Sequence, residues 1–287
     1  MRNALTIDVE EHFQVHNLEA GVQRSSWDRQ ESRVEANVRR VLDLLDRHRV
    51  KATFFVLGWV AERRPRLVGE IATRGHEVAC HGYEHRLVYT QTREEFAEDL
   101  KRSLGVLGEA LSTAPGQDHG AICGYRAPSF SITRAVPWAL DVIREAGLRY
   151  DSSIMPATGH HRYGIGDAPR FAHTLSNGLV ECPVATIRLG GRNWPAAGGG
   201  YFRLLPLAFT RWALRRINRD GQPAVVYLHP WEFDPEQPRI PGPSAWLRFR
   251  HYVNLEQTAP RLERLMQEFA FAPLREVLSG LLACGQE

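Results

Sequence analysis

Short apolar runs rich in β-branched and aromatic residues alternate with helix-periodic segments between residues 4 and 228, and this alternation constrains the fold most. Strands are expected at residues 4–9, 52–57, 77–80, 121–125, 148–150, 180–185 and 224–228. Helices are expected between them at residues 34–49, 64–74, 92–111 and 135–147. Such alternation is typical of an α/β fold with a largely parallel sheet. Seven strands favour an incomplete (β/α) barrel of the seven-stranded kind over an open doubly wound sheet.

The C-terminal fifth of the chain has a different pattern. A proline-rich stretch at residues 230–243 indicates a long loop, and residues 254–269 have helical periodicity. A length of 287 residues allows one large barrel with an appendage. We therefore expect a barrel over residues 1–235 and an extension over residues 236–287 that packs on it.

Composition and charge exclude several classes of protein. With 43% hydrophobic and 24% charged residues, the chain can bury a large core, which argues against disorder. The net charge is only +3. The densest basic cluster follows helical spacing, which indicates the solvated face of an amphipathic helix rather than a nucleic-acid surface. Its members are Arg211, Arg215, Arg216 and Arg219.

Membrane spans and cysteine sites are not expected. The longest apolar run, at residues 52–61, has ten residues, whereas a bilayer span needs about 20. The N-terminal sequence contains no apolar stretch of the length of a secretory signal, so we expect the chain in the cytoplasm. The four cysteines are far apart and form no C-x-x-C pair, which argues against disulfides and a cysteine zinc site.

Side chains that can bind a metal or transfer a proton lie at the ends of five of the expected strands. They are Asp8 and Glu10, His81 and His85, Arg126, Asp151, and His229. Barrel enzymes carry their chemistry on the loops at the carboxyl ends of the strands, so these residues are candidates for one shared site.

The H-G-Y-E-H segment indicates a metal site. His81 and His85 are four residues apart, and on a helical turn both rings point the same way. An H-x-x-x-H pair alone is common by chance, but two histidines with a carboxylate form a recurrent open catalytic site. Glu10 is the expected third ligand. Zinc is the expected ion, although iron, cobalt or nickel suits the same ligands.

Two carboxylates near the first strand could divide the work. Asp8 and Glu10 are two residues apart, so in an extended segment they share one side. One can bind a metal while the other accepts a proton from water; a solvated acidic turn including Glu11 is the alternative. Arg126 and Asp151 fit a structural ion pair, or else contacts that orient Asp8 and the histidine after the last strand.

Five ordered motifs resemble those of a known family. T-I-D-V-E at 6–10, H-G-Y-E-H at 81–85, R-A-P at 126–128, D-S-S at 151–153 and L-H-P at 228–230 resemble the motifs of NodB-type polysaccharide deacetylases, carbohydrate esterase family 4. The resemblance covers about the first 235 residues. W-E-F-D-P at 231–235 and R-H-Y-V-N-L at 250–255 resemble the subgroup associated with bacterial exopolysaccharide and exosortase gene clusters.

The resemblance implies a role for each motif residue. Asp8 would be the base, Glu10, His81 and His85 the metal ligands, Arg126 the partner of Asp8, Asp151 the group that polarises His229, and His229 the acid. The sequence departs from the family at three points. Val9 separates the two acids, which leaves open whether Glu10 or Glu11 reaches the metal. Gly82 stands where the family usually has a Ser or Thr after the first histidine. The R-A-P motif continues with Ser129, whose backbone amide would then stabilise the oxyanion.

The implied activity is removal of N-acetyl groups from the amino sugars of an exopolysaccharide or its oligosaccharide precursor. Trp194, Tyr201 and Trp231 could stack on sugar rings, although each also suits ordinary packing. Three alternatives remain: a metal-independent hydrolase of cyclic amides, of the allantoinase-like kind, a catalytically inactive carbohydrate-binding scaffold, and a non-haem iron oxygenase with the same three ligands.

Overall fold

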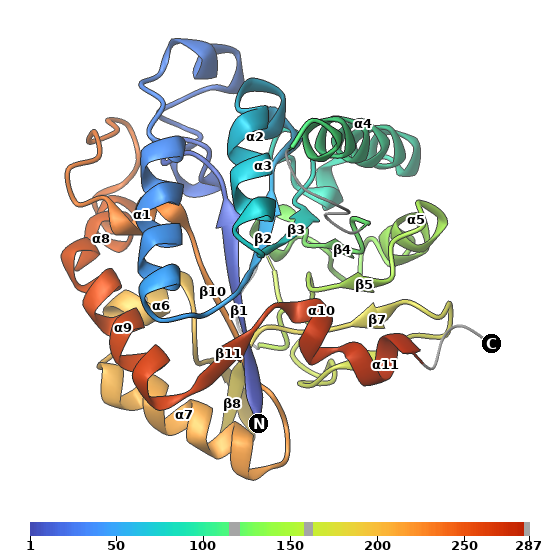
Figure 1. Ribbon diagram of the computed structural model, residues 1–287, viewed down its shortest axis with the longest axis vertical. Helices are drawn as coiled ribbons and strands as arrows, with labels where there is room; N and C mark the ends of the chain where they lie inside the picture. Colours follow the sequence, from blue (N-terminus) through green and yellow to red (C-terminus); the bar gives the residue numbers. More distant parts are fainter. Residues whose placement is uncertain (115–120, 158–162, 284–287) are drawn as a thin grey trace.

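A curled, mostly parallel sheet forms the centre of the computed structural model, which describes residues 1–114, 121–157 and 163–283 (Figure 1). Seven parallel strands follow the order β10-β1-β2-β3-β4-β5-β7, with β6 antiparallel at the edge and β11 beside the start of β1. In chain order the strands are β1 (Arg2–Val9), β2 (Thr53–Val56), β3 (Glu77–Cys80), β4 (Gly124–Tyr125), β5 (Tyr150–Asp151), β6 (His173–Thr174), β7 (Val180–Glu181), β8 (Thr186–Leu189), β9 (Arg192–Pro195), β10 (Val225–Leu228) and β11 (Ala270–Ala272). The predicted incomplete barrel is confirmed.

The sheet curls without closing. Among the described residues, β7 and β10 share no strand ladder. The chain after β7 nevertheless returns to β10, where the Ala185 amide donates to the Val225 carbonyl at 3.0 Å. Strands β8 and β9 form a separate hairpin, which the sequence did not predict.

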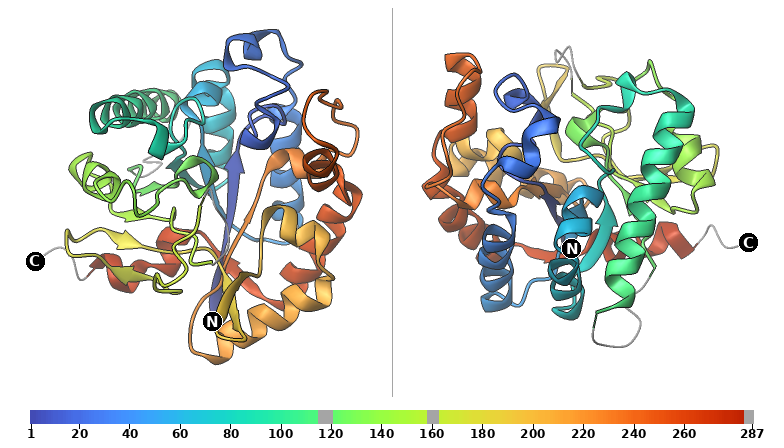
Figure 2. Two further views of the ribbon diagram at one scale, coloured as in Figure 1. Left: turned by 180° about the vertical axis from the view of Figure 1, so that it is seen from behind. Right: turned by 90° about the horizontal axis from the view of Figure 1, so that it is seen from above.

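Helices surround the outside of the curled sheet, as the view from above shows (Figure 2). They are α1 (Val34–Arg47), α2 (Gly58–Arg63), α3 (Pro65–Thr73), α4 (Arg93–Ser112), α5 (Ala139–Glu145), α6 (Gly199–Leu204), α7 (Leu207–Arg219), α8 (Ala245–Tyr252), α9 (Thr258–Glu268), α10 (Leu274–Val277) and α11 (Ser279–Ala283). Helix α1 buries Val34, Val38 and Val41 against the core. Helix α4 begins with a capping box, in which Thr92 accepts from the Glu95 amide and the Glu95 carboxylate accepts from the Thr92 amide.

Residues 270–283 close the amino-terminal end of the sheet. Strand β11 pairs with β1 in parallel, and the Leu274 amide donates to Thr53 Oγ1 at 2.6 Å. Leu274, Leu278 and Leu282 pack in one apolar cluster with Ala4 and other strand residues. Helix α8, which the sequence did not predict, follows the proline-rich stretch. The domain boundary at residue 235 stays a prediction.

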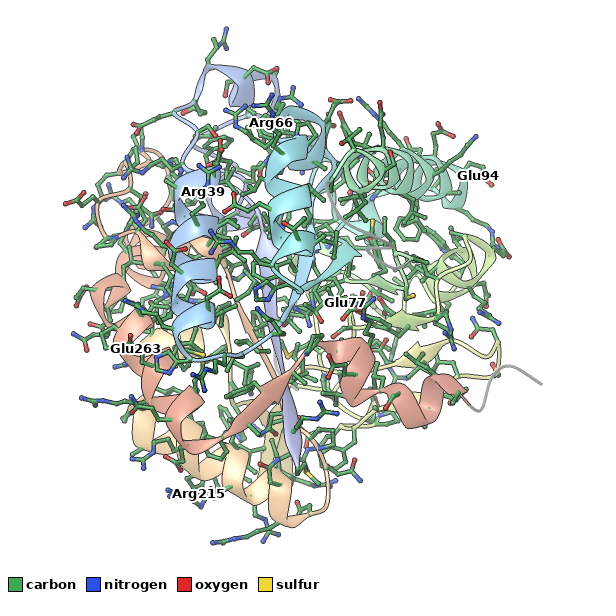
Figure 3. The ribbon with its side chains drawn as sticks, in the orientation of Figure 1. Arg39, Arg66, Glu77, Glu94, Arg215 and Glu263 are labelled. Carbon is green, nitrogen blue, oxygen red and sulfur yellow. The ribbon has the colours of Figure 1, made fainter. Side chains whose placement is uncertain are left out.

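The outer helix faces are charged and solvated. Figure 3 shows Arg39, Glu263 and Arg215 on helices that lie outside the sheet. Arg211 and Arg215 of α7 both pair with Glu268, as expected of an amphipathic surface helix. No helix among the described residues is long and apolar enough to cross a bilayer. The thiols of Cys80, Cys123 and Cys182 are free, and Cys284 lies outside the described residues.

Candidate active site

The carboxyl ends of strands β10, β1, β3 and β4 bring the candidate residues to one edge of the sheet. Asp8 and Glu10 lie at the end of β1, and His81 follows β3. Arg126 follows β4, and His229 follows β10. Because β1 lies between β10 and β2, residues more than 200 positions apart in sequence become neighbours in a buried cleft.

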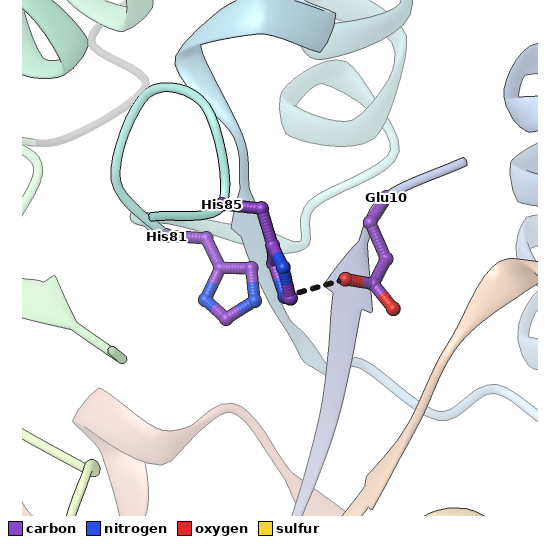
Figure 4. Close-up of side chains that lie close together, drawn as sticks. All are labelled: Glu10, His81 and His85. Atoms are coloured by element: carbon purple, nitrogen blue, oxygen red, sulfur yellow. Dashed lines mark ion pairs between the residues drawn. The ribbon is translucent and has the colours of Figure 1, made fainter. Parts of the chain in front are cut away.

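Glu10, His81 and His85 form a compact buried cluster (Figure 4). One ligand atom from each lies within 4.8 Å of the others, and Glu10 Oε2 is 2.9 Å from His85 Nε2. His81 Nδ1 lies 2.7 Å from the Arg126 carbonyl. If this nitrogen carries the proton and donates it there, the Nε2 lone pair is left for a metal. Burial lowers the pKa of His81 to about 4, so its ring is neutral at pH 7.

Glu10, not Glu11, faces the histidines. Burial by itself would raise the pKa of Glu10, but the neighbouring His85 above all lowers it to about 2. The Glu11 carboxylate instead accepts hydrogen bonds from Ser32 Oγ and from the amides of Arg33 and Val34 at the start of α1. Consecutive side chains of an extended segment point to opposite sides, which explains why Glu10 faces the histidines and Glu11 faces α1.

The two histidines lie on an irregular loop, so the predicted helical turn was wrong. Gly82 and His85 both have left-handed backbones, with φ of 77° and 52°. A side chain at Gly82 would place its Cβ 3.2 Å from Asp99 Oδ2. Asp99 instead accepts from the Tyr83 amide at 2.9 Å, and it thereby braces the loop without a hydroxyl residue at position 82.

Asp8 lies between a fixed cation and the last histidine. Arg126 Nη1 donates to Asp8 Oδ1 at 2.7 Å and to Thr6 Oγ1 at 2.7 Å. The guanidinium is fully buried and is further fixed by Ser152. Asp8 Oδ2 lies 3.9 Å from His229 Nε2. One carboxylate oxygen is therefore held by Arg126, and the other faces the cleft.

His229 is paired with Glu232, so the expected contact with Asp151 was wrong. His229 Nδ1 lies 3.2 Å from Glu232 Oε2, and Arg203 Nε donates to Glu232 Oε1 at 2.8 Å. Burial alone would lower the pKa of His229, but Glu232, Glu10 and Asp8 raise it to about 9. Arg203 and His229 lower the pKa of Glu232 to about 2 against the effect of burial. At neutral pH the Glu232 carboxylate therefore lies between two cations, Arg203 and protonated His229.

Asp151 belongs to a separate buried pair. Its carboxylate accepts from Ser153 Oγ at 2.5 Å, and Ser153 Oγ in turn accepts from the Ala127 amide. Burial and the nearby Asp151 raise the pKa of Glu181 well above its ordinary value, and burial raises that of Asp151. Two adjacent buried carboxyl groups must share a proton, so Asp151 supports the β4–β5 edge rather than the histidine.

We expect Glu181→Gln to stabilise the protein at alkaline pH. Native Glu181 keeps a proton that the unfolded chain releases above its ordinary pKa of 4.5, so folding stability falls as the pH rises. The neutral amide of Gln does not titrate. The gain of the variant in unfolding free energy over the wild type should therefore be absent at about pH 4 and should grow as the pH rises toward about 8. Denaturant titrations over pH test this, and a difference independent of pH would contradict the shared proton.

The three candidate aromatic residues have different positions. Trp231 is 4% exposed, stacks on both His229 and His251, and donates from Nε1 to Glu10 Oε1 at 2.9 Å. It lines the cleft, and its expected stacking on sugar stays a prediction. Trp194 lies half-exposed on β9 and does not line the cleft. Tyr201 lies in α6 beside Gly200, which does line it.

Several cleft residues were missed by sequence reasoning. Ser129, Phe130, Tyr163 and Tyr227 line the cleft, and only the first of them was expected. Ser129 has a left-handed backbone at φ 54° and ψ 26°. Glu232 was also missed, although its position three residues after His229 matches a capping pattern: its carboxylate accepts from the His229 amide at 3.0 Å.

Residues 25–150 match the sequence profile of the family described as polysaccharide deacetylase. The curled half-barrel and the strand-end site agree with it. Residues 25–150, somewhat less than half of the chain, are therefore similar to the polysaccharide deacetylase family. Residues 152–279 match a second profile, described as a domain of unknown function, DUF3473. His229 and Glu232 lie in this second segment.

Curated proteins named as deacetylases match this chain locally. A peptidoglycan-N-acetylglucosamine deacetylase of Bacillus cereus is 36% identical over 76 residues, which are 26% of this chain and 28% of the relative. A chitooligosaccharide deacetylase of Sinorhizobium fredii is 53% identical over 45 residues, 16% of this chain and 21% of the relative. The chain thus spans about a quarter of the length of the curated relatives it matches.

Solved structures of deacetylases share the fold. A candidate polysaccharide deacetylase of Mycobacterium smegmatis superposes with a TM-score of 0.66 at 22% identity, over 98% of this chain and 90% of that one. A family 4 carbohydrate esterase of Streptomyces lividans, in complex with acetate, gives a TM-score of 0.50 at 15% identity, over 97% of this chain and 95% of that one.

Proposed function

We propose that this chain is a metal-dependent hydrolase that removes N-acetyl groups from amino sugars of a bacterial exopolysaccharide or its oligosaccharide precursor. One observation carries the proposal: three buried ligand atoms of Glu10, His81 and His85 lie beside Asp8 and His229. Relatives named as deacetylases of peptidoglycan and of chitooligosaccharides support the reaction class.

The ligand set suits a divalent ion, with zinc as our choice. Two imidazole nitrogens and one carboxylate leave a coordination position open, as in catalytic zinc sites. The hydrogen bond of Trp231 to Glu10 and that of His81 to the Arg126 carbonyl orient the ligands from outside. When bound, such an ion supplies Lewis acidity that lowers the pKa of water toward about 7.

The remaining residues divide the proton transfers. Asp8, whose second oxygen faces the cleft, accepts a proton from the attacking water, and Arg126 fixes its direction. The backbone amide of Ser129 stabilises the oxyanion, a contribution of about 3 kcal/mol for a well-placed donor. His229 is protonated at neutral pH and donates to the departing sugar nitrogen, which releases acetate and a free amine.

Removal of the metal should abolish acetate release from N-acetylated oligosaccharides. We expect chelation to lower the rate at least about a thousandfold and zinc to restore it. His85→Ala should lower zinc affinity at least about a hundredfold, because one of three ligands is lost. His48→Ala is the matched control, since His48 lies on the surface beside Glu263. Release that persists without metal would instead support the metal-independent hydrolase, and zinc binding without any release would support the inactive scaffold.

A further inference from the structure

Helix α8 presents aromatic rings and arginines beside a second hollow of the surface. A groove of about 520 Å³ is lined by residues that include Arg239, Arg248, Phe249 and Tyr252. Trp246 and Phe249 are 60% and 50% exposed, and their rings stack at 5.7 Å with 24° between planes. Large exposed aromatic side chains next to a groove are typical of a binding surface. We call these features the α8 groove.

The same helix forms part of the wall of the catalytic cleft. Leu247 and Arg250 of α8 line that cleft, so the two hollows lie on either side of one helix. Arg203, which holds Glu232, also donates to the backbone carbonyls of Arg250 and His251 at 3.2 and 2.9 Å. In Figure 2 helix α8, in orange, lies next to the blue segment that follows β1. A polymer lying over the cleft therefore has a direct path onto α8.

Helix α8 and the segment before it carry positive charge without carboxylate partners. Arg239, Arg248 and Arg250 form no ion pair within the described part of the chain, whereas arginines such as Arg33 and Arg74 each pair with two or more carboxylates. Residues 236–253 contain these three arginines and a single acid. The guanidinium of Arg239 lies 4.2 Å over the ring of Tyr252, whose hydroxyl accepts from the Ile240 amide. The Arg239 cation is therefore held by an aromatic ring and not by a carboxylate.

We propose that the α8 groove binds the continuing chain of an acidic N-acetylated glycan, one whose repeat carries a carboxylate as well as an acetamido sugar. Stacked rings suit the apolar faces of sugars, and unpaired arginines suit carboxylates. A concave groove on the other side of α8 from the cleft suits a sugar chain better than it suits a flat membrane surface. This inference rests on the proposed function and specifies its substrate class.

Binding of two matched oligosaccharides tests the charge preference. Hyaluronan hexasaccharide carries alternating carboxylates, whereas N-acetylchitohexaose is neutral, and calorimetric titration at low salt gives both affinities. We expect the acidic ligand to bind about tenfold tighter. The double variant Arg239→Gln/Arg248→Gln should abolish this preference. The double variant Trp246→Ala/Phe249→Ala should lower the affinity for both ligands. Trp212→Ala/Arg219→Gln on α7 is the control, because it removes a 43% exposed tryptophan and an arginine that has no ion pair among the described residues, both from a different helix.

Acetate release separates this inference from the proposed function. N-acetylchitobiose is too short to reach the groove from the cleft, so all variants should process it at the wild-type rate. If the protein releases acetate from short sugars but binds both hexasaccharides with equal affinity, the acidic-glycan inference alone is overturned. Binding without release from any sugar would overturn the proposed function alone. If vesicles containing phosphatidylglycerol bind and the Trp246→Ala/Phe249→Ala variant loses them, while the hexasaccharides do not discriminate, the groove is a membrane surface and our inference is wrong.

Discussion

Replacing Asp8 by Asn is expected to lower kcat for acetate release about a thousandfold. Asn keeps the size of the side chain and still accepts the Arg126 hydrogen bond, but it cannot take a proton from water. The neighbouring Glu10 cannot replace it, because its oxygens are committed to Trp231 and His85. Zinc binding should remain, since Asp8 is not in the ligand cluster. Single-turnover acetate release and zinc titration on the same preparation measure both quantities.

The matched control for this variant is Glu11→Gln. Glu11 is equally buried, but it accepts hydrogen bonds at the start of α1, outside the cleft. We expect its activity to persist while the unfolding free energy falls by about 1 kcal/mol through the weaker cap. If Asp8→Asn keeps wild-type kcat, or if it loses zinc together with activity, Asp8 is not the base.

Replacing Glu232 by Gln is expected to lower kcat at least about a hundredfold. It should also shift the alkaline limb of the kcat–pH profile toward lower pH. Glu232 is the main electrostatic support of protonated His229, whose pKa it helps to raise to about 9. A group with a raised pKa works as an acid below that pKa and fails above it. Loss of the negative charge lowers the pKa of His229, so activity should decline at a lower pH. Profiles of kcat between neutral and alkaline pH measure the shift.

Asp151→Asn provides the control for the Glu232 variant. Asp151 was expected from the sequence to polarise His229, yet the structure places it against Ser153. We expect Asp151→Asn to leave the alkaline limb where it is in the wild type. An unshifted limb in Glu232→Gln together with a shifted limb in Asp151→Asn would restore the assignment made from the sequence.

The fold was largely predictable because its signals are local. Residues 77–80 were expected as a strand, and β3 has the same bounds. The capping box at Thr92 and the buried face of α1 were also readable from spacing alone. The α8 helix was missed because it follows a proline-rich stretch and carries exposed aromatic residues, so it lacks a clear apolar stripe.

The candidate site was predictable in its membership and less so in its contacts. Strand ends supplied Asp8, Glu10, His81 and His85 because parallel strands of a curled sheet end at the same edge. The roles assigned to these residues, the bound ion and the cytoplasmic location stay predictions.

The sequence by itself determined the α/β half-barrel class, most of its helices and central strands, and the set of polar residues at one edge of the sheet. Periodicity and motif order carry that information, because each is a property of neighbouring residues. Only the tertiary structure decided that Glu232 supports His229, that Glu10 faces the histidines and that Trp231 is buried between rings. Those contacts join residues up to 221 positions apart. Their geometry depends on the curl of the sheet and on side-chain directions at the ends of strands, which no local pattern specifies.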